Sequence, residues 1–457
     1  MTPPLESLTS CFQGLLPAQL FTCAKDGTPN AAYLSHVEYV DSRHVALSFQ
    51  FFNKSRRNIT ENPHALVALV DPDTGQGWRL RLLYVRSETE GPVFDRMALR
   101  IEAIASYCGL KGIFRLRAAD IYEVLSVDPL PEEPACEARR RQRESLSPVF
   151  TLAALQDLSA RINRAETLEQ LVDSILAGLE ASFGFRYSMI LVPSEDERTL
   201  VTLATRGYDE DGAGAEVRIG EGICGMVAEA RKPIRISGLL RGMLYALASQ
   251  REARGELPRP PIRLPGLPNP ESQLGVALLV RGELVGVLCI ESEVPYRFHE
   301  EDKTTIELLG SYLAIAIQNM QLHERAAEPR TEAHAPASRA TGPARRAAAG
   351  VRREVVYYNG AECVFVDGEY LIRSLPAKIL WRLLNEHQTT GRTEFTNREL
   401  RLDRSLNLPE WKDNLESRLI LLRRRLEQKC PDIRLAPCGR GRFVLELGCE
   451  PVLQTRP

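Results

Sequence analysis

The segment 328–350 limits the fold most strongly, because no part of it can enter a hydrophobic core. It reads EPRTEAHAPASRATGPARRAAAG and holds no aromatic and no large aliphatic residue. A stretch of this composition behaves as a linker. A second stretch, 129–148, combines prolines with a run of charges, and both features resist burial. We therefore expect the chain to fold as separate domains.

The length of the chain supports a division into three domains. At 457 residues it is too long for one core, and a prior of one domain per ~150 residues gives about three. We assign 1–130 to a first domain, 151–325 to a middle domain and 351–457 to a third domain. Linkers are expected at 131–150 and 326–350.

The composition favours a cytoplasmic globular protein. The formal net charge is −2 and the hydrophobic fraction is 44%, values typical of globular chains. Residues 1–10 lack the features of a secretory signal, and the most apolar helix, 306–317, is too short and too polar to cross a membrane. We therefore expect no membrane partner. The ten cysteines have no metal-binding spacing, so we also expect no metal site.

The first domain is expected to be a small antiparallel barrel. Runs of β-branched and aromatic residues bounded by turns predict strands at 31–39, 45–51, 65–70 and 80–86. A polar and basic cluster follows the second of these strands and precedes a short helix. Donors gathered at a helix start suit a phosphate group. A solvated basic turn is the alternative interpretation of the same residues.

The order of a strand, this cluster, an asparagine, the dipeptide NP and a second apolar strand resembles the pyridoxamine 5'-phosphate oxidase-like split barrel. The resemblance covers 16–127 and implies a homodimer that holds FMN at the subunit interface. It implies that Lys54 and Ser55 hold the FMN phosphate, with Arg57 and Asn58 supporting them. Some members of that family bind haem or a deazaflavin, and some bind nothing.

Two histidines of the first domain, His36 and His44, are the candidate ligands if the cofactor is haem. A single histidine beside a strand is more typical of a surface position or of a hydrogen-bonded side chain. The alternative function that these cofactors allow is an FMN- or haem-dependent oxidoreductase with regulatory domains.

The middle domain is expected to be an antiparallel sheet flanked by helices. Apolar residues recur at helical spacing in 152–183 and 302–323. Strands are predicted between these helices, at 187–192, 199–205, 274–280 and 284–291. The apolar stripes of the two helices exceed what one sheet face needs, so these helices are candidates for pairing in a homodimer. Packing within one core is the alternative.

The segments GEGICGMVAEARKPIRIS, at 220–237, and SQLGVALLVRGELVGVLCIES, at 272–292, resemble the central part of GAF domains. This resemblance implies an α+β sensor of a small-molecule ligand, which the sequence does not identify. Cys224 is a candidate redox thiol, because a helix N-terminus can lower the pKa of a cysteine. A small buried residue in a glycine-rich turn is the alternative.

The third domain is expected to hold three helices and a hairpin. Ser374 is the expected N-cap of the first helix, and Thr396 and Glu399 form a capping box at the start of the second. The third helix, 411–429, buries one leucine stripe, and a hairpin with the basic tip CGRGR follows it. From Arg423 to Arg442 the chain holds seven basic and two acidic residues, an excess that suits phosphate binding.

These elements resemble the winged-helix effector of two-component response regulators. The resemblance implies that the helix 411–429 enters the major groove of DNA while the hairpin contacts the backbone. The DNA-binding residues that it implies are Ser417, Arg418, Arg424, Arg425, Arg440 and Arg442. Ile420 and Leu421 depart from the family pattern, which has polar or basic residues there. If they are buried, the domain becomes an interaction module.

The sequence therefore favours a sensory transcriptional regulator over an enzyme. Ligand or redox state would be read by the first two domains and would control the binding of DNA by the third. No nucleophile triad, phosphate-binding GxxxxGKS loop or HExxH motif is present in the sequence, so we assign no catalytic residue. A signalling scaffold that does not bind DNA is the second alternative, beside the oxidoreductase.

Overall fold

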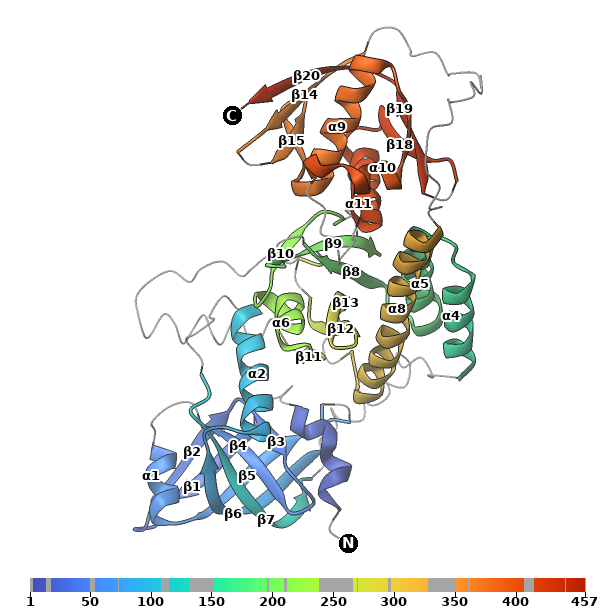
Figure 1. The fold of residues 1–457 in the computed structure, drawn as a ribbon. Helices are drawn as coiled ribbons and strands as arrows, with labels where there is room; N and C mark the ends of the chain where they lie inside the picture. Colours follow the sequence, from blue (N-terminus) through green and yellow to red (C-terminus); the bar gives the residue numbers. More distant parts are fainter. Residues whose placement is uncertain are drawn as a thin grey trace.

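The computed structural model describes residues 3–13, 18–49, 54–72, 74–107, 115–131, 152–194, 197–208, 212–237, 266–268, 270–294, 297–327, 351–360, 362–406, 415–439 and 441–456. These residues form three domains in a row, with the middle domain between the other two (Figure 1). Most of the two predicted linkers lies outside the described residues.

The first domain is a curved sheet of seven antiparallel strands in the order β2-β1-β5-β6-β7-β4-β3. Its elements are η1 (Leu5–Gln13), β1 (Ala18–Cys23), β2 (Pro29–Leu34), β3 (Val37–Tyr39), β4 (His44–Phe49), α1 (Lys54–Glu61), β5 (His64–Val70), β6 (Gly77–Glu88), α2 (Pro92–Tyr107) and β7 (Ala118–Pro129). Burial alternates along β1 and β5, because successive side chains of a strand point to opposite faces. The inner face packs with η1 to form the core.

The structure divides the strand predicted at 31–39 into β2 and β3. Between them, the buried His36 donates its amide hydrogen to the Ser48 hydroxyl of β4 at 3.2 Å. β2 and β3 lie at opposite ends of the strand order, so the chain must pass from one edge of the sheet to the other here. The residues on both sides favour strands, and the sequence pattern alone therefore does not mark the break.

The middle domain is a six-stranded antiparallel sheet in the order β10-β9-β8-β13-β12-β11. Its elements are α4 (Leu152–Arg164), α5 (Leu168–Phe183), β8 (Tyr187–Pro193), β9 (Thr199–Arg206), β10 (Glu216–Arg218), α6 (Gly222–Ala230), β11 (Ile234–Ser237), β12 (Ser272–Val280), β13 (Glu283–Ser292) and α8 (Glu300–Ala327). Ile190 and Val192 face a core with α4, α5 and α8, whereas Met189 and Leu191 face a second core with α6. The sheet is thus covered by helices on both faces.

The helix predicted at 152–183 is two helices, α4 and α5. Thr167 lies between them with an extended backbone, and its hydroxyl accepts a hydrogen bond from the Gln170 amide at 3.2 Å. This is an N-cap, which begins a new helix. Gly184 ends α5 in the left-handed conformation, with φ of 65°.

The third domain holds two small sheets and three helices around one core. Its elements are β14 (Arg352–Tyr358), β15 (Cys363–Val366), β16 (Glu369–Arg373), α9 (Ser374–Thr390), β17 (Glu394–Thr396), α10 (Asn397–Leu402), η2 (Arg404–Leu406), α11 (Leu415–Lys429), β18 (Ile433–Pro437), β19 (Arg442–Leu447) and β20 (Glu450–Arg456). One sheet has the order β16-β15-β14-β20 and the other β17-β19-β18. β20 pairs with β14 in parallel, in register from Arg352 with Glu450 to Tyr358 with Arg456.

The capping box of Thr396 and Glu399 is confirmed at the start of α10. The N-cap prediction for Ser374 is wrong, because Arg373 occupies the N-cap position of α9 and no side chain caps that helix. Ser374 is instead the first helical residue, and its φ is 59°. The local pattern of serine followed by proline fits either position, so it does not separate them.

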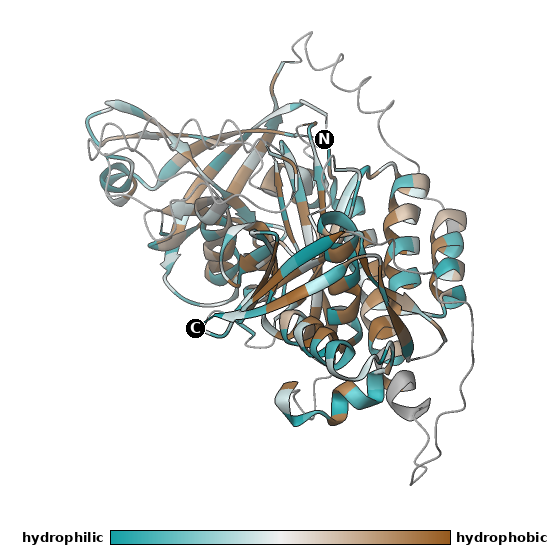
Figure 2. Ribbon diagram, turned by 90° about the horizontal axis from the view of Figure 1, so that it is seen from above, coloured by the Kyte–Doolittle hydropathy of each residue, from teal (hydrophilic) through white to brown (hydrophobic). Residues whose placement is uncertain are grey.

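Hydrophilic and hydrophobic residues alternate along several of the helices (Figure 2), as expected where one side of a helix is packed and the other is open to solvent. Among the described helices, none combines the length and the hydropathy that a membrane span requires. No cluster of three or more histidine, cysteine, aspartate or glutamate residues suited to a metal ion lies in the described part of the chain.

Candidate functional site

A cavity of about 60 Å³ lies in the first domain beside helix α1. Its wall includes Ser55, Arg56 and Asp120. The Arg56 Nη1 donates to both carboxylate oxygens of Asp120 at 2.5 Å, and the guanidinium lies 4.8 Å from the centre of the Phe49 ring. The hydrogen bond to Asp120 raises the pKa of Arg56 above its usual value, although burial opposes this. Arg56 is therefore a fixed, neutralised cation at this cavity.

Only Ser55 of the four predicted FMN-contacting residues lines this cavity. Ser55 is buried, and its hydroxyl accepts a hydrogen bond from Asn30 Nδ2 at 2.9 Å. Asn58 is also buried, but its Nδ2 donates to Thr22 Oγ1 at 3.2 Å and the residue is not part of the cavity wall. Asn58 thus joins α1 to β1 and has a structural contact in place of the predicted cofactor contact.

Lys54 and Arg57, the other two predicted residues, are exposed on α1. They are three positions apart, so they share the outward side of the helix, while Ser55 and Asn58 share the inward side. The four residues therefore do not converge within one chain. The cation that does line the cavity, Arg56, is already paired with the buried Asp120. Within one chain these residues do not fit a cradle for the FMN phosphate.

The two candidate haem ligands each pair with a carboxylate. His36 is buried, and its Nε2 lies 2.8 Å from Glu38. Burial lowers the pKa of His36. At Glu38, burial raises the pKa, but the hydrogen bonds that the carboxylate accepts from His36 and Arg96 outweigh it, and the pKa falls to about 2. His44 lies 2.9 Å from Asp41. Neither histidine lines the cavity beside α1.

The middle domain buries a carboxyl group, Glu291 of β13. Its Oε1 accepts a hydrogen bond from Gln273 Nε2 at 2.5 Å, and its Oε2 accepts one from the Leu267 amide at 2.7 Å. Burial raises the pKa of Glu291 to about 7, although these hydrogen bonds oppose the rise. A buried carboxyl group that titrates near neutrality is a candidate for sensing a proton or a ligand.

The segment 266–268 closes directly over this carboxyl group. Gly266 has φ of 148°, and a Cβ atom at this position would lie 2.4 Å from Glu291 Oε2 and 2.6 Å from Met189 Cε. A Cβ atom here would force the ends of the Glu291 and Met189 side chains to shift, and the backbone conformation also favours glycine. The close approach therefore favours glycine at this point.

The predicted redox thiol, Cys224, lies on α6 and is completely buried. Its neighbour is Cys289 of β13, and the two belong to the same hydrophobic cluster. The hydrogen bond between the two thiols, together with burial, raises the pKa of Cys289. Reactive cysteines are accessible to solvent, whereas both of these thiols are fully buried in this conformation. The redox role of Cys224 stays a prediction.

Helix α11 lies between the core of the third domain and the middle domain (Figure 1). On the side that faces the middle domain, Ile420 is fully buried in the core of α4, α5 and α8. Ser417 is buried too. The Arg418 side chain, 1% exposed, donates to the Pro193 carbonyl of β8 at 2.6 Å. The leucines of the predicted stripe are buried in the third domain's own core: Leu415, Leu419, Leu422 and Leu426.

Two further arginines of α11 pair with carboxylates of α5. Arg424 Nη2 lies 2.5 Å from Asp173 Oδ1, and Arg423 Nη1 lies 3.5 Å from Glu169 Oε2. Burial raises the pKa of Glu169, whereas the two arginines lower it in part. The charges that sequence analysis assigned to DNA are therefore used inside the protein in this state.

Of the remaining predicted DNA-binding residues, Arg425 also borders the middle domain, beside Gly214. Arg425 is half-buried and donates to the Leu371 carbonyl at 3.0 Å. Arg442 is exposed at the start of β19, in the hairpin. Arg440 lies outside the described residues. The structure thus covers the predicted helix surface, while the described end of the hairpin is open to solvent.

Comparison with known proteins identifies one of the three domains. Residues 165–318 match the family model described as the GAF domain. The chain contains a GAF domain. Such a domain implies small-ligand sensing or signalling. No curated protein matches the chain.

The solved structures similar to parts of this chain include GAF domains and an FMN-binding protein. The GAF domain of a phosphoenolpyruvate-protein phosphotransferase from Acinetobacter is 16% identical, with a TM-score of 0.30 over 38% of this chain and 96% of that chain. The FMN-binding protein of Syntrophomonas wolfei is 18% identical, with a TM-score of 0.23 over 28% and 89%. HupZ of Group A Streptococcus is 20% identical, with a TM-score of 0.22 over 28% and 100%.

The first domain contacts the GAF domain at the N-terminus of α6. Ser106 of α2 is buried, and its hydroxyl accepts a hydrogen bond from the Gly222 amide at 2.9 Å and donates to the Gly220 carbonyl at 3.4 Å. Glu221, at the N-cap position, makes no side-chain cap. Ser106 therefore satisfies, from another domain, one of the amide groups that have no partner within the first turn of α6.

A cavity of about 380 Å³ lies between the GAF domain and the third domain. Thr199 and Glu216 line it from the GAF domain, and Arg373, Arg418 and Arg425 line it from the third domain. The Arg373 Nε donates to the Glu216 carboxylate at 2.6 Å. The volume falls within the range of small-molecule pockets. A molecule bound here would contact both domains.

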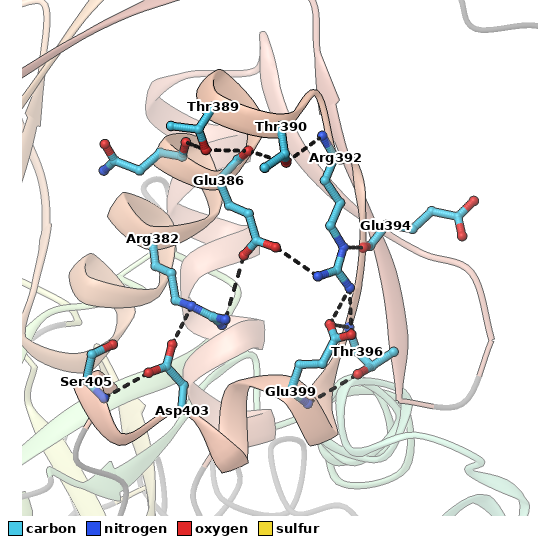
Figure 3. A network of polar contacts seen from close by, with 11 residues as sticks. Arg382, Glu386, Thr389, Thr390, Arg392, Glu394, Thr396, Glu399, Asp403 and Ser405 are labelled. Carbon is cyan, nitrogen blue, oxygen red and sulfur yellow. Dashed lines mark hydrogen bonds and ion pairs between the residues drawn. The ribbon is translucent and has the colours of Figure 1, made fainter. Parts of the chain in front are cut away.

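Polar contacts hold α10 in place beside α9 (Figure 3). Arg392 pairs with Glu386 of α9 at 2.8 Å and with Glu399 of α10 at 2.6 Å. Glu399 also belongs to the capping box with Thr396. These contacts link α9, β17 and α10 within the third domain.

Proposed function

We propose that this protein is a sensory transcriptional regulator in which the GAF domain controls the access of the third domain to DNA. The observation that carries the proposal is the position of α11, whose predicted DNA-binding side is buried against the GAF domain. Its arginines bind GAF carboxylates and a GAF carbonyl group. A DNA phosphate would compete for the same guanidinium groups.

The order of elements in the third domain supports its interpretation as a winged helix. Three strands precede α9, α10 and α11, and the hairpin of β18 and β19 follows. Arg442 stands exposed at the beginning of β19, where a wing would approach the DNA backbone. In this proposal α11 is the helix that enters the major groove.

The GAF domain would act by changing the population of two states. In the state described here, α11 cannot reach a groove because the GAF domain covers it. A ligand that binds the released state more tightly shifts the population toward DNA binding, and a ligand that fills the cavity between the domains shifts it the other way. The two domains share the walls of that cavity, so it offers direct coupling.

Binding of labelled duplex DNA by the full chain, measured by fluorescence anisotropy at about 50 and 200 mM salt, tests the proposal. The variant Glu169→Lys/Asp173→Lys represents the released state. In that background, Arg442→Ala is expected to weaken binding and to reduce its salt dependence, while Arg352→Ala, an exposed arginine on β14, is expected to leave binding unchanged. An absence of salt-dependent binding in both the wild type and the released variant would overturn the proposal.

A signalling scaffold that does not bind DNA is the second candidate, and one observation favours it. Ile420 and Leu421 are completely or almost completely buried, and Ile420 belongs to the hydrophobic cluster of the GAF domain. An apolar residue at this position suits a permanent docking helix. The same DNA-binding experiment separates the candidates, because only the regulator gains affinity when α11 is released.

For the first domain we propose FMN as the ligand, on the resemblance to the split-barrel family, in a homodimer whose second chain completes the site. Of the four residues predicted to contact FMN, Ser55 lines the cavity beside α1 within one chain. Bound FMN would supply sensitivity to redox state. A flavin absorbance spectrum between about 350 and 500 nm from the purified protein would support this ligand, and a featureless spectrum would remove it from the proposal.

A further inference from the structure

The cavity between the GAF domain and the third domain lies at the edge of the GAF sheet, where β10 is the last strand. Strands β9 and β10 border it on one side, and α11 borders it on the other (Figure 1). Its volume of about 380 Å³ exceeds that of an engineered protein cavity of roughly 150 Å³ that binds benzene. The space is therefore large enough for a small organic molecule.

Positive charge dominates the described wall of this cavity. Four of its side chains are cationic and two are carboxylates: Arg373, Lys378, Arg418, Arg425, Glu216 and Glu362. Both carboxylates already have a partner, because Arg373 binds Glu216 at 2.6 Å and Lys378 lies 2.7 Å from Glu362. Helix α9 also begins at the cavity without a side-chain cap, and the positive end of its dipole adds to the charge. The wall therefore favours an anion.

Arg425 of α11 is a cation whose partners among the described residues are all uncharged. Its Nε donates to the Leu371 carbonyl at 3.0 Å, and its Nη1 donates to the Gln428 side-chain oxygen at 3.1 Å. A carboxylate or phosphate group binds a guanidinium more strongly than a neutral oxygen does. The stem of Arg425 also meets the GAF domain, since a Cβ atom on Gly214 would lie 3.0 Å from its Cδ. Arg425 thus offers its charge at the boundary of the two domains.

Apolar side chains form the wall next to these cations. Leu421 of α11 is buried at the cavity, and it lies one helical turn from both Arg418 and Arg425. Val201 of β9 lines the cavity from the GAF domain and is also buried. A molecule that combines a charged group with an apolar part would match both kinds of surface. Leu421, which departs from the winged-helix pattern, then has a place in a binding site.

We propose that this cavity binds a small organic anion, with its carboxylate or phosphate group at Arg425 and its apolar part against Leu421. The role of this ligand rests on the proposed function. An anion that contacts Arg425 and the GAF domain favours the state in which α11 is covered, and it occupies a guanidinium that is predicted to bind DNA. Binding of the anion and binding of DNA would therefore oppose each other.

Isothermal titration calorimetry of the full chain, in chloride buffer without DNA, tests the ligand class. The probes are phenyl phosphate, benzoate, benzyl alcohol and benzylammonium. The first two carry the two candidate anionic groups on the same ring, and the last two are neutral and cationic counterparts. At least one anion is expected to bind about tenfold more tightly than benzyl alcohol, because charged hydrogen bonds are strong. The proposal is wrong if neither anion binds more tightly than benzyl alcohol.

Substitutions at position 425 test the place of binding with the tighter of the two anions. Arg425→Gln is expected to raise its dissociation constant about tenfold or more. Arg425→Lys keeps the charge and is expected to stay within about threefold of the wild type. Arg434→Gln, at an exposed arginine of β18, should have no effect. Far-UV circular dichroism reports whether each variant is folded. Wild-type affinity in Arg425→Gln would show that the anion binds elsewhere.

The variant Glu169→Lys/Asp173→Lys tests whether both domains form the site. The two carboxylates lie outside the described cavity wall and hold α11 against α5. Their reversal is expected to weaken anion binding about fivefold or more, although it adds positive charge. Glu180→Lys, at another carboxylate of α5, should leave the affinity unchanged. Equal affinity in the double variant and the wild type would contradict a shared site.

The two proposals fail in different ways. DNA binding by the double variant, without anion binding by the wild type, would overturn the anion site and leave the regulator standing. Anion binding that depends on Arg425, without salt-dependent DNA binding by either protein, would overturn the regulator and leave the anion site standing.

Discussion

The Arg424 guanidinium of α11 lies 2.5 Å from the Asp173 carboxylate of α5, and this ion pair joins the third domain to the GAF domain. The neighbouring pair of Arg423 and Glu169 lies on the same two helices. The arginine side chains of the two pairs are only 12% and 11% exposed, so solvent screens these pairs less than it screens pairs on the open surface. Together with the buried Ile420, these pairs position α11 against the GAF domain.

Reversal of both carboxylates is expected to release α11. Glu169→Lys/Asp173→Lys replaces two attractions with two repulsions, so we expect DNA affinity at low salt to rise about tenfold, which corresponds to ~1.4 kcal/mol. Anisotropy titrations of a labelled duplex measure the change. Glu180→Lys is the matched control, because Glu180 also lies on α5 but pairs with Arg206 inside the GAF domain. An equal rise in the control would show a nonspecific charge effect.

Truncation of Ile420 is expected to weaken the contact between the domains. The side chain is fully buried in the GAF core, so Ile420→Ala should cost about 2–5 kcal/mol through lost burial and the cavity left behind. Calorimetry is expected to show the third domain unfolding at a lower temperature than in the wild type. Leu402→Ala, at an exposed leucine of the same domain, should change the curve little.

The stability of the GAF domain is expected to fall as pH rises from about 4.5 to about 7. The pKa of Glu291 is near 7 in the folded protein and 4.5 by its ordinary value. In this window the folded chain keeps a proton that the unfolded chain has released, so the free energy of unfolding decreases, by roughly 3 kcal/mol in total. The contribution is fully present below pH 4.5 and is lost above pH 7.

Urea unfolding at several pH values, for the wild type and for Glu291→Gln, measures this contribution. The glutamine side chain stays neutral, so the difference in unfolding free energy between the two proteins should change across the window. A difference that is constant from pH 4.5 to pH 8 would show that Glu291 does not hold a proton in the folded state.

Loss of the Ser106 hydroxyl is expected to loosen the start of α6. Ser106→Ala removes the acceptor for the Gly222 amide, and a missing cap costs about 1 kcal/mol. Amide hydrogen exchange should become faster at the first turn of α6. Ser126→Ala, which removes a half-buried hydroxyl elsewhere in the first domain, is the control. Unchanged exchange at Gly222 would show that the cap has no energetic role.

Local features of the fold could be predicted from the sequence. The strands of the GAF domain, the capping box at Thr396 and the leucine stripe of α11 all depend on residues that are close together in the chain. The residues 165–318 that match the GAF family fall within the middle domain predicted at 151–325. Periodicity and caps are local properties, and a single sequence carries them.

The contacts between domains could not be predicted in the same way. Arg418 and Arg424 have the appearance of a basic DNA-binding surface in sequence, and only the packed structure shows that the GAF domain supplies their partners. Ser106 caps a helix more than a hundred residues away, so no local motif marks it. The sequence also does not reveal which side of α1 faces the cavity. The predicted cofactor contacts therefore included Lys54 and Arg57, whereas the cavity is lined by Arg56.

The parallel pairing of β20 with β14 gives the last strand of the third domain a protective role. β14 lies between β15 and β20, and without residues 450–456 its hydrogen-bonding groups on that side would be free. An uncovered strand of this kind recruits strands from other molecules and promotes aggregation. Proteolysis before Glu450 would thus replace an edge strand that contains Pro451 with the more apolar β14 as the new edge, and strand pairing between neighbouring chains would become easier.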